Sequence, residues 1–529
     1  MTDLIHDLIV NTAQHLPHAE AILYQERSMN YAALANETEA RAHGLRSLGL
    51  VRGERVAIYL EKRFEAVIAI CATSAAGGVF VPINPILKPE QVSYILKDCA
   101  ARILVTSHAR LKILQVALAA CHDLRVIIAI DVESEPAAIN GCAVIPWKAL
   151  DDEQRLPNSA PMIDQDRAAI IYTSGSTGKP KGVVLSHRNI VAGAQSVSQY
   201  LANRSDDRIL TVLPLSFDYG LNQLMSAFYV GAANVLMNYL LPRDILYAVQ
   251  QYHITGLAAV PLLWIQLAGL NWEGGTSLRY ITNSGGVMPR KTLDQLRKKL
   301  PATQIFLMYG FTEAFRSTYL APEELDRRPD SIGKAVPNAE ILVLREDGSS
   351  CVAGEPGELV HRGAFVAMGY WNDAEKTAQC FRPINTHQEG LSIAEIAAWS
   401  GDTVRMDEEG FLYFIERRDA MIKTSGYRVS PTEIEEILYA TGDVAEAVVL
   451  GVPHPLLGQA IIAVACGMQN EGIDSKRLLR YCKQRLPAYM IPHFIDIRAG
   501  SLPRNPNGKI DRALLFQQMQ HFFVRNQSE

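Results

Sequence analysis

The sequence lacks a strong excess of charge of either sign. Its 529 residues contain 51 Lys and Arg against 56 Asp and Glu, so the net charge is −5. A protein that binds nucleic acid through bulk positive charge needs a basic excess, and we therefore expect no nucleic-acid partner. Charged residues make up 20% of the chain and hydrophobic residues 48%, which is ordinary globular usage and excludes a disordered chain or a rod.

Closely spaced cysteines are also missing. None of the eight cysteines forms a Cys-x-x-Cys pair, and the two nearest, Cys466 and Cys482, are 16 positions apart. This spacing argues against a disulfide framework or a zinc cluster and fits a reducing compartment. We therefore expect a cytoplasmic protein.

A long uninterrupted hydrophobic run is the third absence. The most apolar stretch, residues 66–87, contains Gly77, Gly78 and Pro82 as well as polar residues, so it predicts a buried helix and a strand rather than a membrane span. The N-terminus carries Asp3 and Asp7 without a long apolar run, which does not fit a signal peptide.

Short apolar runs alternate with helical stretches through most of the chain. Residues 55–60, 78–82 and 102–106 look like strands, and residues 63–76 and 90–99 look like helices between them. This rhythm is typical of an α/β fold, with stacked and mostly parallel sheets covered by helices. The rhythm recurs at residues 209–213, 234–237 and 254–260.

The pattern changes after about residue 335. Residues 339–344, 357–361 and 410–414 read as short strands between turns and predict a small β-rich unit. In the last block, residues 430–433 read as a capping box that starts a helix, followed by two strands and another helix. We predict a large N-terminal domain over residues 1–416 and a small, mobile α+β lid domain over residues 417–529.

A glycine-rich loop in residues 170–184 is the most informative stretch. Backbone N–H groups in such a loop can cradle phosphate oxygens, while its hydroxyls and lysines add donors and charge. It is not a Walker A loop, because Thr173 stands at the first glycine position and Pro180 at the Ser or Thr position. Composition alone also allows a flexible linker. The candidate phosphate-binding residues are Thr173, Ser174, Gly175, Ser176, Thr177, Gly178, Lys179 and Lys181.

Residues 172–182, Tyr-Thr-Ser-Gly-Ser-Thr-Gly-Lys-Pro-Lys-Gly, resemble the signature of the AMP-forming adenylating enzymes. That superfamily comprises acyl-CoA synthetases, nonribosomal adenylation domains and beetle luciferases. Further motifs follow in the order of the family across almost the whole chain. Together with residues 217–220, 237–244, 283–286 and 312–319, they most resemble the acyl-CoA ligases associated with bacterial exosortase A systems.

Two motifs of the large domain imply a nucleotide and metal site. In residues 309–314 the resemblance assigns Tyr309 to stack on adenine, Thr312 to phosphate and Glu313 to Mg²⁺, which accepts one carboxylate together with phosphate oxygens. A Thr-Glu pair after Gly is otherwise a common helix cap. In residues 399–402 the resemblance assigns Asp402 to the ribose hydroxyls, where the alternative is an Asp in a turn.

Four residues of the last block carry implied roles in the lid. The resemblance places Arg417 at the ribose, Asp419 at the hinge, Arg428 at the phosphate side and Gly426 on the thiol side. Glu416 stands where the family has Gly, which leaves the rate of domain rotation open.

Lys509 follows an Asn-Gly turn near the C-terminus. In the family this lysine bridges the substrate carboxylate and the α-phosphate, although a lone surface lysine is more often solvated. We count Lys509, Thr312 and Glu313 as the catalytic candidates.

The acid pocket is where subfamilies differ. Its candidate residues are Phe217, Asp218, Ser284, Gly285 and Gly286. Enzymes that activate amino acids often carry Phe-Asp at this place, with the Asp paired to the substrate amine, so Asp218 either binds an amine or is a helix cap or tunnel-wall residue.

The resemblance implies two half-reactions that need ATP, Mg²⁺ and a thiol. A small carboxylic acid, with or without an amine, is adenylated, and the acyl group then passes to coenzyme A or to the phosphopantetheine of a carrier protein. The chain ends soon after Lys509, so we expect any carrier to be a separate protein. A luciferase-like reaction, a non-catalytic nucleotide binder and a scaffold of another fold are the rival interpretations.

Overall fold

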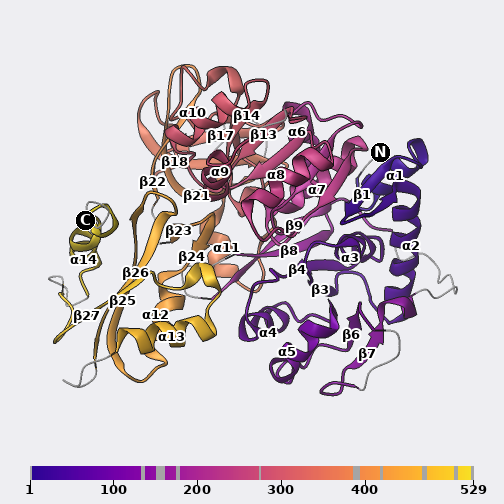
Figure 1. The fold of residues 1–529 in the computed structure, drawn as a ribbon, viewed down its shortest axis with the longest axis horizontal. Helices are drawn as coiled ribbons and strands as arrows, with labels where there is room; N and C mark the ends of the chain where they lie inside the picture. Colours follow the sequence, from indigo (N-terminus) through magenta and orange to yellow (C-terminus); the bar gives the residue numbers. More distant parts are fainter. Residues whose placement is uncertain are drawn as a thin grey trace.

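The fold is built on two large sheets in the first two thirds of the chain (Figure 1). In the computed structural model, the described residues are 3–132, 138–150, 161–173, 179–272, 276–384, 394–417, 421–467, 474–504 and 510–525. Parallel pairs dominate both sheets, and antiparallel strands lie at their edges. The predicted α/β class with mostly parallel sheets is confirmed.

Strands that are distant in the sequence lie side by side in both large sheets. In spatial order, one sheet has nine strands: β16 (Lys334–Ala335), β15 (Thr318–Leu320), β14 (Gln304–Tyr309), β13 (Tyr280–Asn283), β12 (Gly256–Ala259), β10 (Arg208–Thr211), β11 (Ala233–Leu236), β1 (Glu20–Tyr24) and β2 (Arg27–Asn30). The other has eight: β19 (Gly369–Tyr370), β9 (Lys181–Ser186), β8 (Arg167–Thr173), β4 (Val79–Pro82), β3 (Arg55–Tyr59), β5 (Ile103–Thr106), β6 (Val126–Ala129) and β7 (Ala143–Pro146).

Helices fill the space between the two sheets and cover their outer faces. The inner helices are α1 (Asp7–His15), α2 (Tyr31–Ser47), α3 (Phe64–Ala75), α6 (His187–Tyr200) and α7 (Asp218–Val230). The outer helices are α4 (Pro89–Asp98) and α5 (His108–Leu118) on the eight-stranded sheet, and α8 (Pro242–Gln251), α9 (Pro261–Ala268) and α10 (Arg290–Lys299) on the nine-stranded sheet. Helix α3 is buried almost all round, as expected for a helix packed between two layers.

A smaller antiparallel sheet follows the large sheets. Its strands are β17 (Ala339–Leu344), β18 (Pro356–Gly363), β21 (Glu395–Met406), β20 (Phe381–Ile384) and β22 (Leu412–Arg417), with α11 (Ala374–Cys380) beside them. This is the β-rich unit predicted after residue 335. The predicted domain boundary after Glu416 falls at the end of β22, and the hinge candidate Asp419 lies outside the described residues.

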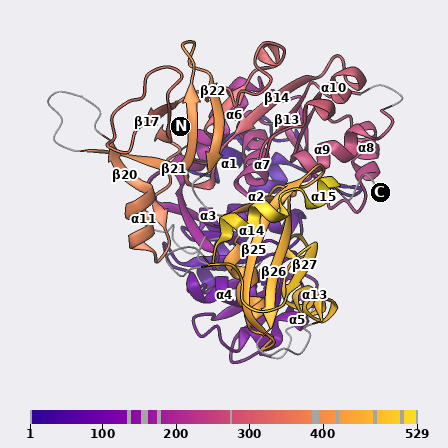
Figure 2. The same ribbon diagram turned by 90° about the vertical axis from the view of Figure 1, so that its left-hand side faces the viewer.

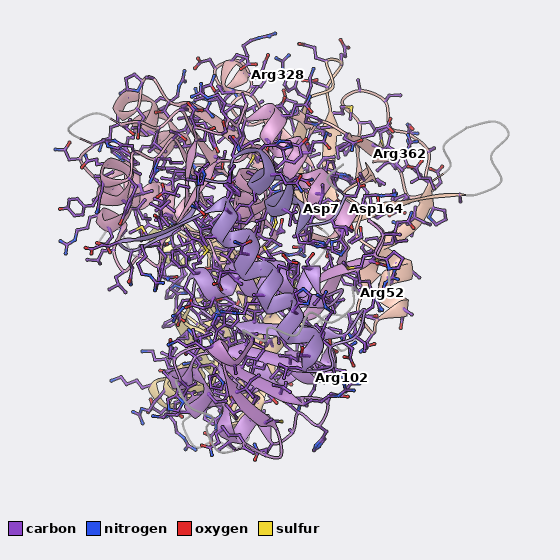
Figure 3. The ribbon with its side chains drawn as sticks, turned by 90° about the vertical axis from the view of Figure 1, so that its right-hand side faces the viewer. Asp7, Arg52, Arg102, Asp164, Arg328 and Arg362 are labelled. Carbon is purple, nitrogen blue, oxygen red and sulfur yellow. The ribbon has the colours of Figure 1, made fainter. Side chains whose placement is uncertain are left out.

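The C-terminal unit packs against one side of the large domain (Figures 1 and 2). Its sheet contains β24 (Tyr427–Val429), β23 (Ile422–Thr424), β26 (Gly458–Gly467), β25 (Val444–His454) and β27 (Phe494–Arg498). Helices α12 (Pro431–Tyr439) and α13 (Ser475–Arg485) cover one face, and α14 (Arg512–Met519) and α15 (Phe522–Arg525) belong to the core on the other. The side of the large domain away from this unit carries surface ion pairs such as Arg52–Asp166 and Arg188–Asp164, both at 2.6 Å (Figure 3).

Candidate active site

One cavity of about 420 Å³ lies where the large sheets and the C-terminal unit meet. It opens at the carboxyl ends of strands from both large sheets, since Pro82 ends β4, Thr173 ends β8, and Ser284 and Gly310 follow β13 and β14. Ligands of open α/β sheets bind at this edge, because loops that leave the strands there can surround them. The predicted site residues that line the cavity are Thr173, Phe217, Asp218, Ser284, Gly285, Thr312, Gly426 and Arg428.

The glycine-rich loop connects β8 and β9 at one end of the cavity. Thr173 pairs with Lys181 across this hairpin. Lys181 is half-buried with its Nζ 5.8 Å from the centre of the Tyr370 ring, and burial lowers its pKa, with a further lowering by the charge of Lys376. Lys179 is exposed, and Ser174, Gly175, Ser176, Thr177 and Gly178 lie outside the described residues, so their phosphate role stays a prediction.

The Thr312–Glu313 pair forms a short 3-10 turn, η2 (Thr312–Ala314), directly after β14. Both side chains are buried, and the Tyr370 hydroxyl donates a 2.5 Å hydrogen bond to Oε1 of Glu313. No cluster of three or more metal-binding side chains occurs among the described residues. A single buried carboxylate fits Mg²⁺, which takes few protein ligands and keeps phosphate oxygens and water as the others.

Asp402 and Tyr309 meet beside the cavity rather than on its wall. Asp402 lies in β21 and is fully buried, and the Tyr309 hydroxyl donates a 2.5 Å hydrogen bond to its Oδ2. Arg417 is the cross-strand partner of Asp402 in β22, which brings both ribose candidates to one place in the backbone. Their predicted roles at ribose and adenine stay predictions.

Asp218 has a cationic partner within the chain. It is the first residue of α7, and Arg316 Nη1 donates a 3.1 Å hydrogen bond to its Oδ2. Burial raises the pKa of Asp218, and the Arg316 charge acts against that rise. Asp218 therefore lines the cavity as part of an ion pair. Its carboxylate already has a cationic partner without any substrate amine.

The apolar wall of the cavity comes from α9 and from Val260, the residue directly before this helix. Leu262 and Leu263 line it, as the sequence suggested. Trp264 belongs to the core instead, since it is fully buried and its Nε1 donates to the carbonyl oxygens of Ala259 and Thr282 at 3.1 and 3.0 Å.

The glycine-rich segment after β13 lies beside this wall. Gly286 does not line the cavity; its carbonyl accepts a 3.0 Å hydrogen bond from Asn283 Nδ2. Gly285 approaches the C-terminal unit closely, because a Cβ at this position would lie 3.8 Å from the carbonyl oxygen of Gly426.

The β23–β24 hairpin brings Gly426 into the cavity. Its turn residues Ser425 and Gly426 both have positive φ, of 53° and 83°. A Cβ at Gly426 would lie 2.8 Å from Cγ1 of Val260, so the hairpin touches the large domain without room for a side chain. Tyr427 stacks on Tyr489 at 3.8 Å between ring centres and meets the Phe217 ring edge-on at 5.4 Å.

The predicted capping box at residues 430–433 is wrong. Ser430 accepts no capping hydrogen bond, although Pro431 does occupy the first helical position. Glu433 faces the cavity instead, where its Oε1 accepts a 3.0 Å hydrogen bond from Nε2 of Gln91 in α4. Burial raises the pKa of Glu433 to about 7, because the contact with the large domain withdraws the carboxylate from water.

The nearest described residues on either side of Lys509 are Arg504 and Ile510, and they lie on the other face of the C-terminal sheet. Ile510 packs against the core formed by β25, β26 and α14, and Arg504 pairs with Ile510 and with Glu446. None of the described residues from 494 onward lines the cavity. Lys509 itself lies outside the described residues.

Sequence reasoning missed several cavity residues, among them these five: Gln91, Arg316, Tyr427, Glu433 and Tyr489. Only Arg316 had a usable signal, since it follows the Thr-Glu motif within four positions. The others reach the cavity through packing between the two domains.

A family profile described as "AMP-binding enzyme" matches residues 9–371. The chain belongs to this family of adenylate-forming enzymes. A second profile, "AMP-binding enzyme C-terminal domain", matches residues 433–509. The resemblance carried by residues 172–182 is thereby confirmed.

The curated relatives of this AMP-binding enzyme differ in length and in the thiol acceptor that their names give, a carrier protein or coenzyme A. A linear gramicidin synthase of Brevibacillus parabrevis is 30% identical over 514 residues, which are 97% of this chain but only 10% of that protein. L-proline--[L-prolyl-carrier protein] ligase of Pseudomonas fluorescens is 29% identical and covers 98% of this chain and 99% of its own. Indoleacetate--CoA ligase of Aromatoleum aromaticum is 28% identical and covers 93% and 94%.

Solved structures agree with the fold of this AMP-binding enzyme. An o-succinylbenzoate CoA synthetase from Bacillus subtilis, bound with its product analogue, superposes with a TM-score of 0.82 at 27% identity and covers 96% of this chain and 98% of its own. In the described parts of the chain, every helix is too short or too polar to cross a membrane.

Proposed function

We propose that this AMP-binding enzyme is an ATP-dependent acid–thiol ligase that joins a small carboxylic acid to coenzyme A. The observation that carries the proposal is the single cavity that several candidate site residues share. It is lined by Thr173 of the β8–β9 hairpin, by Phe217 and Ser284 of the acid pocket, and by Gly426 of the β23–β24 hairpin. Relatives that cover nearly the whole chain include a CoA ligase, which supports the same interpretation.

In the first half-reaction, a carboxylate oxygen of the acid attacks the α-phosphorus of ATP. The new P–O bond forms as the bond to pyrophosphate breaks, which leaves an acyl adenylate. Thr173 and Thr312 line the phosphate end of the cavity, and their hydroxyls can donate to phosphate oxygens. A bound Mg²⁺ held by Glu313 would offset the negative charge of the phosphates.

In the second half-reaction, a thiol sulfur attacks the acyl carbon and AMP leaves. The thiol proton passes to solvent, and the C–S bond replaces the C–O bond to AMP. The Gly426 hairpin lies in the cavity in this structure, while the described neighbours of Lys509 lie on the other face of the unit. We assign the structure to the arrangement for thiol attack, and we place Lys509 in the cavity only during adenylation.

A second candidate is an amino-acid-activating ligase that loads a separate carrier protein. The prolyl-carrier protein ligase, which matches over nearly its full length, favours this candidate. The Asp218–Arg316 pair opposes it, because the carboxylate that would bind an amine already has a buried cation beside it.

ATP–pyrophosphate exchange tests both candidates. The purified protein is assayed against amino acids and plain carboxylic acids, with Lys509→Ala alongside, and active acids are then offered with coenzyme A or with a phosphopantetheinylated carrier. Exchange followed by a CoA thioester supports the proposal. Exchange with amino acids alone and transfer only to the carrier supports the second candidate, and silence with every acid, despite bound ATP, refutes both.

A further inference from the structure

The acid pocket contains a buried ion pair that the general reaction does not need. Arg316 is 3% exposed in its side chain and Asp218 17%, and both line the cavity. Arg316 Nη1 also donates to the Phe315 carbonyl oxygen at 3.1 Å, and its guanidinium lies 4.7 Å from the centre of the Tyr219 ring. Its buried Nε–H has no partner among the described residues. The guanidinium is thus held in place by Asp218, by the Phe315 carbonyl and by the Tyr219 ring.

The position of Arg316 is imposed by an unusual backbone. Phe315 has φ +54°, a region that side chains with a Cβ disfavour, and its ring is fully buried. Gly193 in α6 makes room for that ring, because a Cβ there would come within 2.4 Å of it. The chain reverses at Phe315, so Glu313 points toward Tyr370 while Arg316 points toward Asp218. One short segment thus contributes both Thr312 and Arg316 to the cavity wall.

The charges of the pair decide which substrate group fits. Asp218 and Arg316 neutralise one another, and Val260, Leu262 and Leu263 are among the apolar residues that line the same cavity. Glu313, the other carboxylate that acts on Asp218, already accepts a hydrogen bond from the Tyr370 hydroxyl. A substrate ammonium would add an unbalanced charge to a buried neutral pair, whereas a neutral oxygen adds none.

We propose that the Asp218–Arg316 pair is a specificity determinant that binds a hydroxyl group on the acid substrate. A hydroxyl suits the pair because its O–H can donate to the Asp218 carboxylate while its oxygen accepts from Arg316. The enzyme then activates a hydroxy acid in preference to the amino acid or the plain acid of the same length. This inference rests on the proposed acid–thiol ligase function.

The test is ATP–pyrophosphate exchange with matched sets of acids. Each set contains a plain acid, its hydroxy, amino and dicarboxylic counterparts of equal chain length, with the substituent at successive carbons. Wild-type enzyme should favour one hydroxy acid by roughly tenfold or more in kcat/KM over the other members, because unpaired polar groups in the pocket reject the analogues that lack the hydroxyl.

Two variants should shift the preference in opposite directions. Arg316→Met leaves the Asp218 carboxylate without its cationic partner and should raise the relative use of the amino acid. Asp218→Asn leaves the Arg316 guanidinium without its anionic partner and should raise the relative use of the dicarboxylic acid. Arg279→Met is the matched control, since Arg279 pairs with the buried Asp207 outside the cavity and should leave the order of preference unchanged.

The outcomes separate this inference from the function on which it rests. Exchange with plain or amino acids as the best wild-type substrates, or the same order of preference in both pocket variants, overturns the hydroxyl inference and leaves the ligase standing. Exchange with no acid at all overturns the ligase function itself. If Arg316→Met fails to fold, the wild-type order of preference together with Asp218→Asn still decides, because a wild-type preference for one hydroxy acid that Asp218→Asn abolishes is expected only if the pair binds the hydroxyl.

Discussion

Replacement of Gly426 by Ala should separate the two half-reactions. The new Cβ would lie 2.8, 2.9 and 3.1 Å from three side-chain atoms of Val260, which belongs to the large domain. Two of these contacts are below 3.0 Å, so either the hairpin or Val260 must shift to relieve them. Adenylation, for which we place Lys509 in the cavity instead, does not need this contact.

Two free-energy costs of the added Cβ set the size of the expected loss of thioester formation. At φ +83° an alanine costs about 1–2 kcal/mol in the hairpin itself, whichever way the domain is turned. The overlap with Val260 adds about 1–3 kcal/mol, and only when the hairpin is docked. Thioester formation should therefore fall by roughly 5- to 150-fold relative to adenylation.

The assay compares ATP–pyrophosphate exchange with thioester formation for one active acid. Gly442→Ala is the control, because Gly442 lies in the same unit at φ +76° with no atom within 4 Å of a new Cβ. It should lower stability slightly and leave the ratio of the two rates unchanged. Equal loss of both rates in Gly426→Ala, or the same ratio change in Gly442→Ala, would refute the docking argument.

Three further substitutions test the site. Glu313→Gln keeps an oxygen for the Tyr370 hydroxyl but removes the charge, so ATP–pyrophosphate exchange should fall by roughly 100-fold and require more Mg²⁺. Lys509→Ala should lower exchange by roughly 100- to 1,000-fold and spare thioester formation from a supplied acyl adenylate. Glu433→Gln should stabilise the protein increasingly as pH rises from about 4.5 to about 7, measured by thermal unfolding, and the gain should level off above that range. Burial raises the pKa of Glu433 from 4.5 to about 7 in the folded state, so the wild type loses stability as pH rises between those two values.

Each of these three has a clear contrary result. Unchanged exchange in Glu313→Gln at low Mg²⁺ would remove Glu313 from the metal site. Equal loss of exchange and of thioester formation in Lys509→Ala would contradict a role confined to adenylation. For Glu433, the neighbouring titratable groups are Glu436 on the same helix and Tyr489 across the cavity. A difference in Tm between variant and wild type that stays constant with pH would show that Glu433 is not the titrating group.

The elements that local pattern predicted are found within a few residues of their expected bounds. The strand expected at 339–344 is β17, and the helix expected at 90–99 is α4, which begins at Pro89 and ends at Asp98. Such elements depend on side-chain alternation and on caps within a few positions, and these are visible in the sequence. The capping box expected at 430–433 does not form, because the Glu433 side chain accepts a hydrogen bond from Gln91 of the large domain instead.

The candidate site was predicted as a set of motifs but not as a set of contacts. Thr173, Ser284 and Thr312 reach one cavity because they lie at the carboxyl ends of strands in the two large sheets, which parallel strand order implies. Gly426 reaches it only through the packing of the C-terminal unit against the large domain. The apolar pattern of α9 does not tell which of its side chains meet the cavity: Leu262 and Leu263 line it, whereas Trp264 belongs to the core.

The sequence by itself determined the family, the order of the motifs and the α/β layering, since each is carried by residues close together in the chain. Tertiary structure alone decided the partner of Asp218. Arg316 lies 98 positions away, and it reaches Asp218 only because Phe315 reverses the backbone and Gly193 leaves room for its ring. Charge pairing in a buried site depends on distances of a few ångströms, and packing, rather than local sequence, sets those distances.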